Sequence, residues 1–587
     1  MTTLITLDNY LSVDTDNLTS VKIDREMKGD AFSIFISRVL ANITSLDCSG
    51  CKNITSIPIL PNLTELICYK CKGLTSLPYL PNLTSLDCSQ CELLTSIPFL
   101  PNLTILSCNF CHKLNSIPVL PNLTTLSCKW CVKLSSIPEL HKLISLDCSQ
   151  CKLLTNMPDL PKLSSLICNE CDKLTSIPYL PNLTALACYG CYRLTLIQVL
   201  PNLTTLICRW CKELTGIPEL PNLTTLSCDG CARLTTIPYL PNLISLSCCR
   251  CTELSFIPEL PNLTTLSCDG CSGLTYIPVL PKLTTLSCKE CNRLTTIQIL
   301  PNLTTLTSNG CKELTSIPEL PNLTALSCAY CTNLTGIPVL PKLTNLDCTW
   351  CEGLAVIPYL PNLTTLICLW CEKLANISEL PILNTLECGF CTGLINIPEL
   401  PNLNTLSCKG CKELTTIPYL PMLSYLDCYI CTGLTGIPVL PNLTKLNCVG
   451  CSGLTSISVL PNLTNLDCCS CERLTSIPDL PNLIELDCRW CERLTYIPML
   501  PNLTNLLFTG CNGLTSIPHF SNLKILDNKI NINTVLISKV VDDRECVICY
   551  SGENVYMTKC NHTFHKECLN TWLQIHRECP YCRYIIR

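Results

Sequence analysis

The amino-acid sequence predicts a β-rich solenoid with little helix, followed by a small domain held together by metal ions. Three observations predict this architecture. A unit of 20 residues repeats without an insertion from Ala41 to Phe520, giving 24 copies. Within each unit, apolar residues alternate with other positions as they do along a short strand. The last 42 residues contain eight Cys and His residues at the spacing of metal ligands.

Length and composition exclude several classes of protein. The 587 residues carry a net charge of -5, which argues against a nucleic-acid ligand. Prolines and polar residues interrupt every apolar run well below the length of a membrane span. The segment from Met1 to Asp30 has no basic region followed by an apolar one, so we expect no secretory leader. With 54 cysteines in a long chain, we therefore expect a reducing, cytoplasmic compartment and no membrane association.

Residues 1–40 lie before the first repeat and are expected to form an N-terminal cap region. The stretch from Asp30 to Leu40 places Phe32, Phe35, Ile36 and Val39 at offsets of three, four and seven residues. These offsets put the apolar side chains on one face of a helix. We expect this helix to shield the first coil of the solenoid from water.

Residues 41–527 form the repeat region, with 24 full units and a partial one from Ser521 to Asp527. In the unit Pro221–Leu240, Leu occupies positions three, six, fourteen and twenty, and Ile occupies position seventeen. Leucine at position six and cysteine at position eight alternate as in a strand, so stacked units should form a parallel ladder. Prolines at positions eighteen and one fix φ and lack an N–H, which makes a helix on the back of the coil unfavourable.

This pattern of leucine and cysteine resembles the leucine-rich repeat in its cysteine-containing, short-coil variant. The resemblance implies a solenoid fold and does not identify the ligand of the repeats. The recurring Leu-Pro-Asn-Leu-Thr text is also similar to repeat proteins of giant DNA viruses that infect amoebae. That second resemblance implies a viral protein that acts in the host cytoplasm.

Cysteine occupies position eleven in all 24 units and position eight in 22, the exceptions being Ser308 and Phe508. One interpretation treats each cysteine as a small buried apolar residue whose thiol could bond the turn backbone. The other is metal or redox chemistry. We favour the first, because a ligand set would not need so many copies and each exception would spoil a site.

All five tryptophans outside the C-terminal domain fall at position ten of their units. They are Trp130, Trp210, Trp350, Trp370 and Trp490. Exposed aromatic side chains on one face are typical binding anchors, so we expect them to bind a protein substrate on the concave face. The alternative is that they pack along neighbouring coils and shield the ladder. Trp350 and Trp370 occupy adjacent units and form the best single patch.

The C-terminal domain is expected to span residues 546–587, after a cap and linker over residues 528–545. Its ligand residues follow the order CxxC, CxH, HxxC and CxxC, and they are Cys546, Cys549, Cys560, His562, His565, Cys568, Cys579 and Cys582. Zinc prefers tetrahedral thiolate and imidazole ligands, so eight of them predict two ions. Sites closed by four protein ligands leave no position for a reacting water, so the ions are expected to be structural.

This order resembles the RING finger of the two-histidine type, a family that recruits ubiquitin-conjugating enzymes. The resemblance implies that Cys546, Cys549, His565 and Cys568 hold one zinc ion. The second ion would be held by Cys560, His562, Cys579 and Cys582.

The resemblance also implies a function. Residues at the positions that contact the conjugating enzyme in this family are Ile548, Trp572, Pro580 and Arg583. The implied activity is that of a RING-type ubiquitin ligase, which uses no covalent nucleophile of its own: the repeats would bind a protein substrate and the RING a ubiquitin-charged enzyme. The alternative is a non-catalytic adaptor that uses both domains for protein–protein interaction.

Overall fold

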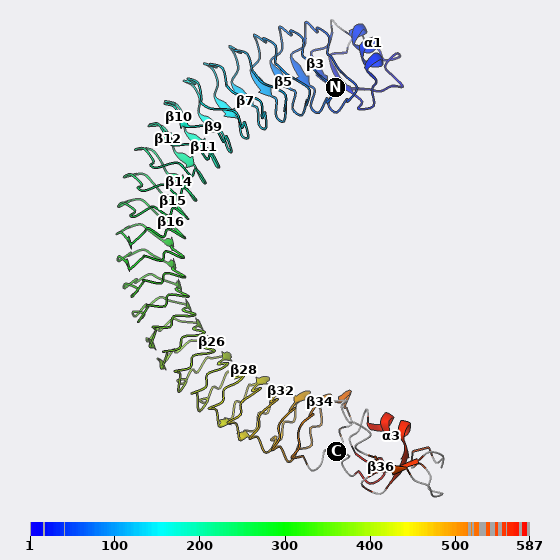
Figure 1. Ribbon diagram of the computed structural model, residues 1–587, viewed down its shortest axis with the longest axis vertical. Coiled ribbons are helices and arrows are strands. Elements are labelled where there is room, and N and C mark those ends of the chain that lie inside the picture. Colours follow the sequence, from blue (N-terminus) through cyan, green and yellow to red (C-terminus); the bar gives the residue numbers. More distant parts are fainter. Residues whose placement is uncertain are drawn as a thin grey trace. The chain divides into compact units, whose positions relative to one another are not determined.

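The computed structural model describes residues 2–15, 18–39, 42–514, 518, 520, 522–526, 536–539, 546, 548–549, 555–558, 560, 562–573 and 578–583. The chain divides into two compact units, Met1–Leu303 and Thr304–Arg587. Figure 1 follows the elements in chain order, from helix α1 in blue to helix α3 in red. No helix in the described part of the chain has the length and apolar character needed to cross a membrane.

The first unit begins with two strands that precede the repeats. Strand β1 (Thr3–Ile5) pairs in parallel with β2 (Ser20–Ile23), and β2 pairs in parallel with β3 (Ser45–Asp47), so both extend the ladder. Helix α1 (Gly29–Val39) lies between β2 and β3 in the sequence and buries Phe32, Phe35 and Ile36. The predicted helix is therefore confirmed, but residues 1–40 are more than a cap because they add two strands to the sheet.

In the first unit, positions five to seven of each repeat form a three-residue strand that pairs in parallel with its neighbours. The register is constant: Leu226, for example, lies opposite Leu206 and Leu246. After β3, these strands are β4 (Glu65–Ile67), β5 (Ser85–Asp87), β6 (Ile105–Ser107), β7 (Thr125–Ser127), β8 (Ser145–Asp147), β9 (Ser165–Ile167), β11 (Ala185–Ala187), β13 (Thr205–Ile207), β14 (Thr225–Ser227), β15 (Ser245–Ser247), β16 (Thr265–Ser267) and β18 (Thr285–Ser287).

The second unit contains the same kind of parallel ladder, again with one strand for each coil. Its strands are β20 (Thr305–Thr307), β21 (Ala325–Ser327), β22 (Asn345–Asp347), β24 (Thr365–Ile367), β26 (Thr385–Glu387), β27 (Thr405–Ser407), β28 (Tyr425–Asp427), β30 (Lys445–Asn447), β32 (Asn465–Asp467), β33 (Glu485–Asp487), β34 (Asn505–Leu507) and β35 (Ile525–Leu526). The predicted parallel β ladder is confirmed in both units.

The other side of the coil is almost entirely irregular, extended backbone. Residues 42–514, all of which are described, contain no helix. Two-residue parallel pairs form only at positions sixteen and seventeen, where no proline stands. They are β10 (Ser176–Ile177) with β12 (Leu196–Ile197), β17 (Tyr276–Ile277) with β19 (Thr296–Ile297), β23 (Val356–Ile357) with β25 (Asn376–Ile377), and β29 (Gly436–Ile437) with β31 (Ser456–Ile457). In each pair the second strand is followed by a residue other than proline, whose amide donates to the carbonyl of position seventeen one coil earlier; these residues are Gln198, Gln298, Ser378 and Ser458. The other coils have proline at that position, which lacks the N–H donor and cannot continue a helix.

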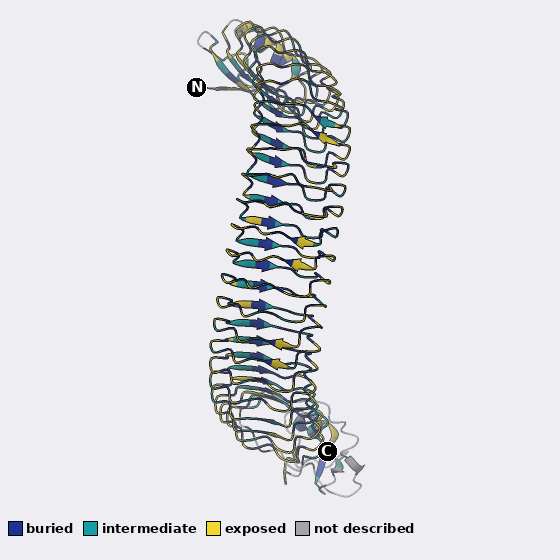
Figure 2. Cartoon of the chain, turned by 90° about the vertical axis from the view of Figure 1, so that its left-hand side faces the viewer, coloured by how far each residue is buried: buried dark blue, intermediate teal, exposed yellow. Residues whose placement is uncertain are grey.

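The core of each coil contains the repeated Leu, Ile and Cys side chains. Figure 2 shows the short strands one above another with their middle residues buried. The thiol of Cys231, at position eleven, donates a hydrogen bond to the carbonyl oxygen of Cys208 in the preceding coil at 3.0 Å. A separate side-chain hydrogen bond with the Cys231 thiol, together with complete burial, holds the pKa of the Cys208 thiol well above its ordinary value. The described cysteines at positions eight and eleven are buried, apart from the half-buried Cys511, and thiols at position eleven bond the turn backbone, as the first interpretation expects.

The C-terminal domain has its own small sheet and helix. Strands β36 (Leu536–Lys539), β37 (Val555–Thr558) and β38 (Thr563–His565) pair antiparallel, and α3 (Lys566–Leu573) follows directly. The domain core contains Cys546, Phe564, Leu569, Leu573 and Cys579. Strand β36 lies in the segment expected to be a cap and linker, residues 528–545, of which the structure describes only 536–539. These four residues instead extend the sheet of the C-terminal domain.

Candidate metal centres and interaction surfaces

The eight Cys and His residues at the C-terminus converge in two groups of four. Within each group the candidate ligand atoms lie within 4.8 Å of one another. One group is Cys546, Cys549, His565 and Cys568, and the other is Cys560, His562, Cys579 and Cys582. These are the two sets that the family resemblance implies.

The spacing of these atoms suits tetrahedral zinc. Cys579 Sγ lies 3.7 Å from His562 Nδ1, and Cys568 Sγ lies 3.9 Å from His565 Nδ1. Cys549 Sγ is closer, at 3.1 Å from His565 Nδ1. Bonds of about 2.3 Å to sulfur and about 2.1 Å to nitrogen would separate two tetrahedral ligands by roughly 3.6 Å. The two groups therefore fit two zinc ions, each closed by four protein ligands.

The hairpin and helix of the domain explain why residues distant in sequence meet. His565 ends β38, and Cys568 is the third residue of α3, so the strand–helix junction presents both to the Cys546–Cys549 turn. Cys560 and His562 lie between β37 and β38, and this hairpin holds them beside Cys579 and Cys582. One hairpin thus carries ligands of both groups, which fixes the two sites relative to each other.

The thiols differ in how readily they lose a proton. Burial raises the pKa of the Cys546 thiol, but hydrogen bonds from the backbone of His565, Cys549 and Ile548 outweigh it and lower the pKa to about 7. Burial raises the pKa of Cys568 and of Cys579 to about 12. Zinc binds thiolates, so metal binding must release these protons and is coupled to folding of the domain.

Two supporting residues were not predicted from the sequence. The buried hydroxyl of Thr558 donates to the carbonyl of His562 at 3.0 Å and lies 3.1 Å from Cys560 Sγ. The exposed ring of Tyr581 packs on the imidazole of His562 with ring centroids 4.8 Å apart. Both contacts orient groups beside metal ligands. The position of Thr558, two residues before Cys560, was the only available signal, and threonine is too common for that signal to be specific.

The residues expected to contact a conjugating enzyme lie on the surface of the same domain. Ile548 and Trp572 are partly buried and pack against the domain core. The indole N–H of Trp572 donates to the carbonyl of Glu578 at 3.0 Å, which holds the ring in place. Pro580 is half-buried. Arg583 is exposed, and its amide donates to the carbonyl of Cys579 at 3.0 Å.

Comparison with known proteins identifies this domain. The family described as Ring finger domain matches residues 544–583. The C-terminal domain is a RING finger of the two-histidine type. Over 46 residues it is 52% identical to the RING-H2 finger protein ATL10 of Arabidopsis thaliana, covering 7% of this chain and 18% of that protein. Over 66 residues it is 39% identical to the E3 ubiquitin-protein ligase RHA2B of Arabidopsis thaliana, covering 10% of this chain and 45% of that protein.

The chain thus spans less than half the length of these relatives, and the matches are confined to the region of the RING finger. The repeats are similar to a solved leucine-rich repeat protein from Bacteroides ovatus at 17% identity. That similarity covers 65% of this chain and 87% of the other, with a TM-score of 0.29.

The tryptophans at position ten do not all share one environment. Trp350 and Trp370 stack in parallel with ring centroids 4.9 Å apart, and Trp130 stacks on Phe110 at 5.8 Å. Trp210 and Trp490 lie instead over Gly230 and Gly510 of the following coils. The structure therefore brings together only Trp350 and Trp370 among the five, and it packs them along neighbouring coils.

Position ten has a left-handed backbone, which is unusual for large side chains. Trp350 and Trp370 both have φ of 59°, and Trp210 has φ of 60°. Eight coils use glycine there, including Gly230 with φ of 72°, because glycine adopts this conformation without a steric cost. A left-handed residue with a Cβ atom costs about 1–2 kcal/mol, and each stacked aromatic pair returns about 0.5–1.5 kcal/mol.

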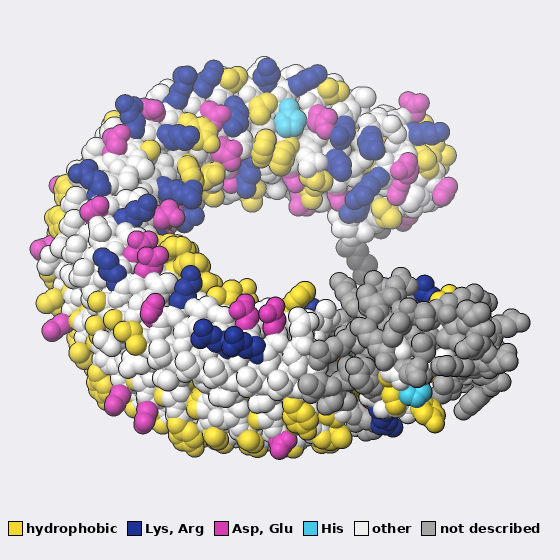
Figure 3. Space-filling view, turned by 60° about the horizontal axis from the view of Figure 1, so that its bottom comes forward, with side chains coloured by type: hydrophobic (Ala, Val, Ile, Leu, Met, Phe, Trp, Pro, Cys, Tyr) yellow, Lys and Arg dark blue, Asp and Glu magenta, His cyan; other side chains and the backbone are white. Residues whose placement is uncertain are grey.

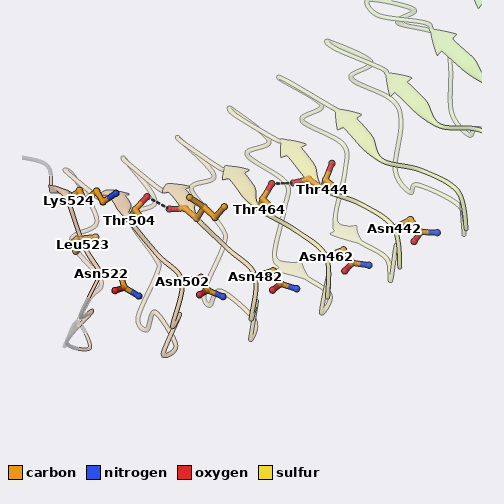
Figure 4. Close-up of a pocket in the computed structure, with 11 residues that line it drawn as sticks. Asn442, Thr444, Asn462, Thr464, Asn482, Asn502, Thr504, Asn522, Leu523 and Lys524 are labelled. Atoms are coloured by element: carbon orange, nitrogen blue, oxygen red, sulfur yellow. Dashed lines mark hydrogen bonds between the residues drawn. The ribbon is translucent and has the colours of Figure 1, made fainter.

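A polar groove runs along another edge of the coils within each unit. Figure 4 shows Asn side chains at position two in one row and Thr side chains at position four in a second row. The amide nitrogen of Asn462 donates to the carbonyl of Pro441 at 2.8 Å, and the hydroxyl of Thr464 donates to the carbonyl of Thr444 at 3.0 Å. These hydrogen bonds connect each coil to the preceding one, so both rows of side chains stabilise the stacking of the coils.

Proposed function

We propose that this protein is a RING-type ubiquitin ligase whose repeats bind a protein substrate. The observation that carries the proposal is a zinc-binding RING domain on which Ile548 and Trp572 are packed against the core yet remain partly exposed. Relatives of this domain include a protein named as an E3 ubiquitin-protein ligase. The described cysteines, which form no disulfide, suit action in a reducing compartment such as the cytoplasm.

The mechanism needs no nucleophile from this chain. Ile548 and Trp572 would form an apolar contact with a conjugating enzyme whose own cysteine carries ubiquitin. Arg583, which is exposed beside the Cys579–Cys582 turn, would donate hydrogen bonds to both the enzyme and ubiquitin. Its guanidinium offers five donors in a rigid fork, which suits a bridge between two surfaces. The contribution to the rate is positioning of the thioester for attack by a substrate lysine.

The first experiment measures zinc and chain formation together. Full-length protein should contain two equivalents of zinc by elemental analysis and should build ubiquitin chains on itself with at least one enzyme of a conjugating-enzyme panel. Ile548→Ala should abolish chain formation while keeping both equivalents of zinc. Lys566→Ala, at an exposed position of α3, is the matched control and should keep the activity.

Two outcomes would overturn the proposal. Zinc well below two equivalents would contradict the metal centres themselves. Full zinc with no chains from any enzyme of the panel would favour the non-catalytic adaptor that joins two proteins.

A further inference from the structure

Four aromatic side chains at position ten of consecutive coils form one continuous stack, which we call the aromatic strip. Its members are Tyr330, Trp350, Trp370 and Phe390. The ring centroids are 6.1, 4.9 and 4.1 Å apart in chain order, and the rings lie within 11° of parallel. All four residues have φ between 59° and 61°, the left-handed region that other coils give to glycine. The chain therefore accepts an unfavourable backbone at four successive positions to place these rings together.

The strip is accessible to a partner. Tyr330 is 53% exposed, and the other three rings are partly exposed. At position ten, side chains lean toward the following coil, as the contact of Phe390 with Gly410 shows. Gly310, at position ten of the preceding coil, has no side chain. No ring from that position therefore covers the face of Tyr330 that points away from Trp350. The first ring of the strip thus offers a face, and the others offer edges.

Carboxylates precede and follow position ten in the sequence of the coils that form the strip. Asp347 and Glu387 lie on the strand side, at position seven, and Glu352 and Glu372 lie on the turn side, at position twelve. Between them are the apolar side chains of Ile367 and Leu369. This border contrasts with the face in view in Figure 3, where Lys and Arg are interspersed with Asp and Glu.

Four of the six other position-seven acids of the repeats form an ion pair with a lysine or arginine, whereas Asp87 and Asp467 form none among the described residues. Asp147 pairs with Lys129 at 2.9 Å, and Asp427 pairs with Lys409 at 3.1 Å. Asp347 accepts instead from the Thr349 amide at 3.1 Å and the Ser327 hydroxyl at 3.4 Å. Among the described residues, none of the four border carboxylates forms an ion pair with a lysine or arginine. Within the described part of the chain, these four carboxylates are therefore available to pair with a basic partner.

We propose that the aromatic strip binds a short extended segment of the substrate protein that carries arginine and apolar side chains. This inference rests on the proposed function, since it names the class of substrate that the ligase would select. Arginine fits better than lysine, because a planar guanidinium stacks on an aromatic face and donates two parallel hydrogen bonds to a carboxylate. Apolar side chains of the segment would contact Ile367, Leu369 and the indole edges.

The dimensions set the length of the segment. Four coils at a strand spacing of about 4.8 Å place the first and last rings roughly 14 Å apart, a span of about four or five extended residues. An acidic segment or a nucleic acid would meet carboxylates of like charge and is disfavoured. The recognised feature is thus a basic and apolar motif of a few residues.

The test is a binding measurement that needs neither conjugating enzyme nor ubiquitin. Zinc-loaded full-length protein is titrated into fluorescein-labelled peptides of eight residues that alternate Arg with Leu, Lys with Leu, or Glu with Leu. We expect binding of the arginine peptide by anisotropy, weaker binding of the lysine peptide and none of the glutamate peptide. Raising the salt concentration should weaken the binding, because exposed charges are screened.

Glycine variants separate the rings from the fold. Trp350→Gly together with Trp370→Gly should weaken binding of the arginine peptide at least tenfold. The fold should tolerate both changes, because eight coils already have glycine at this position with a left-handed backbone. The matched control is Gln90→Gly with Ser470→Gly, at the same position outside the strip, and it should leave the affinity unchanged. Glu352→Gln with Glu372→Gln should weaken binding several-fold and reduce its salt dependence.

Equal binding of the glutamate peptide, or equal loss in the control pair, would overturn the assignment of the strip. Absence of any binding to the arginine peptide would do the same. Because chain formation is measured without these peptides, failure here leaves the ligase proposal standing, and failure of chain formation leaves peptide binding measurable.

Discussion

The thiol of Cys271 donates a hydrogen bond to the carbonyl oxygen of Cys248, 23 residues earlier, at a distance of 3.0 Å. The same bond recurs between positions eleven and eight of other coils, as from Cys491 to Cys468 at 3.0 Å. A buried carbonyl left without a partner costs about 1–3 kcal/mol, so each thiol satisfies a group that the turn would otherwise leave unpaired. Cysteine is thus a structural residue in these repeats.

Thiol reactivity should separate the buried cysteines from the others. In the native zinc-loaded protein, we expect iodoacetamide to modify the half-buried Cys249, Cys469 and Cys511 and to spare the fully buried cysteines at positions eight and eleven. The reason is that alkylation needs an accessible thiolate, and burial denies both access and charge. Mass spectrometry of digested protein locates the modified residues. Chelation of zinc should add only the six cysteines of the RING finger, and early labelling of Cys271 would contradict the structure.

Replacing Ser308 with cysteine should stabilise the repeats. Ser308 stands at position eight, where its hydroxyl is completely buried and makes no hydrogen bond among the described residues. A thiol is less costly to remove from water than a hydroxyl, so Ser308→Cys should raise the free energy of unfolding by about 1 kcal/mol. The denaturant midpoint measures this change. Ser56→Cys, at an exposed position, should leave the midpoint unchanged, and a lower midpoint for Ser308→Cys would refute the explanation.

The carboxyl of Asp467 should make stability depend on pH. Burial raises its pKa above the ordinary value of 3.8, the amide of Cys469 lowers it less, and the neighbouring carboxylate of Asp487 raises it again. The folded state therefore holds this proton more tightly than the unfolded chain does. Its contribution to the free energy of unfolding falls as pH rises through the folded pKa, and it is unfavourable at pH 7.

Asp467→Asn should consequently stabilise the protein at pH 7 by a few tenths of a kcal/mol, with the difference disappearing well below the unfolded pKa. Asn447 already fills the equivalent position one coil earlier and accepts from the amide of Val449 at 3.2 Å, so the amide side chain fits there. Thermal unfolding, followed by far-UV circular dichroism at pH 7 and at a pH well below the unfolded pKa, measures this difference in stability. Asp427→Asn, which breaks the ion pair with Lys409, should change stability with the opposite sign.

Arg583 should affect ubiquitin transfer without affecting zinc. Arg583→Lys keeps the charge but loses the planar fork, so discharge of ubiquitin from a charged conjugating enzyme onto free lysine should slow about tenfold. Arg493→Lys, at an exposed position of the repeats, is the matched control. Zinc content should remain two equivalents in both variants. An unchanged discharge rate for Arg583→Lys would remove this residue from the proposed mechanism.

Much of the repeat fold could be predicted because its signal is periodic. The positions of Leu226 and Cys231 recur every 20 residues, and the alternation of Leu and Cys indicates the strand directly. The order of Cys546 to Cys582 likewise indicates two metal groups. In both cases the spacing of the residues reflects a geometric requirement of the structure, and the sequence alone shows that spacing.

Elements with non-local partners could not be predicted in this way. Val21 lies opposite Leu46, 25 residues later, because α1 is inserted between their strands. The spacing of 20 residues that marks the other strand pairs is therefore absent here. Leu536 pairs with Thr558 across a segment that has no repeat to mark it. The left-handed turn at position ten had a signal that was not used, namely glycine in eight coils such as Gly230. The stacking of Trp350 on Trp370 follows from that turn.

The constant register has a consequence for how this chain can change in length. Every coil between β4 and β18, and again between β21 and β34, presents to its successor the same leucine, the same thiol and the same carbonyl. Excising twenty residues between equivalent positions would remove one coil and rejoin two matching surfaces. Duplicating twenty residues would insert one more coil. Gene rearrangements of that size should be tolerated anywhere within these stretches, whereas an insertion of ten residues would place a polar segment where a thiol is needed.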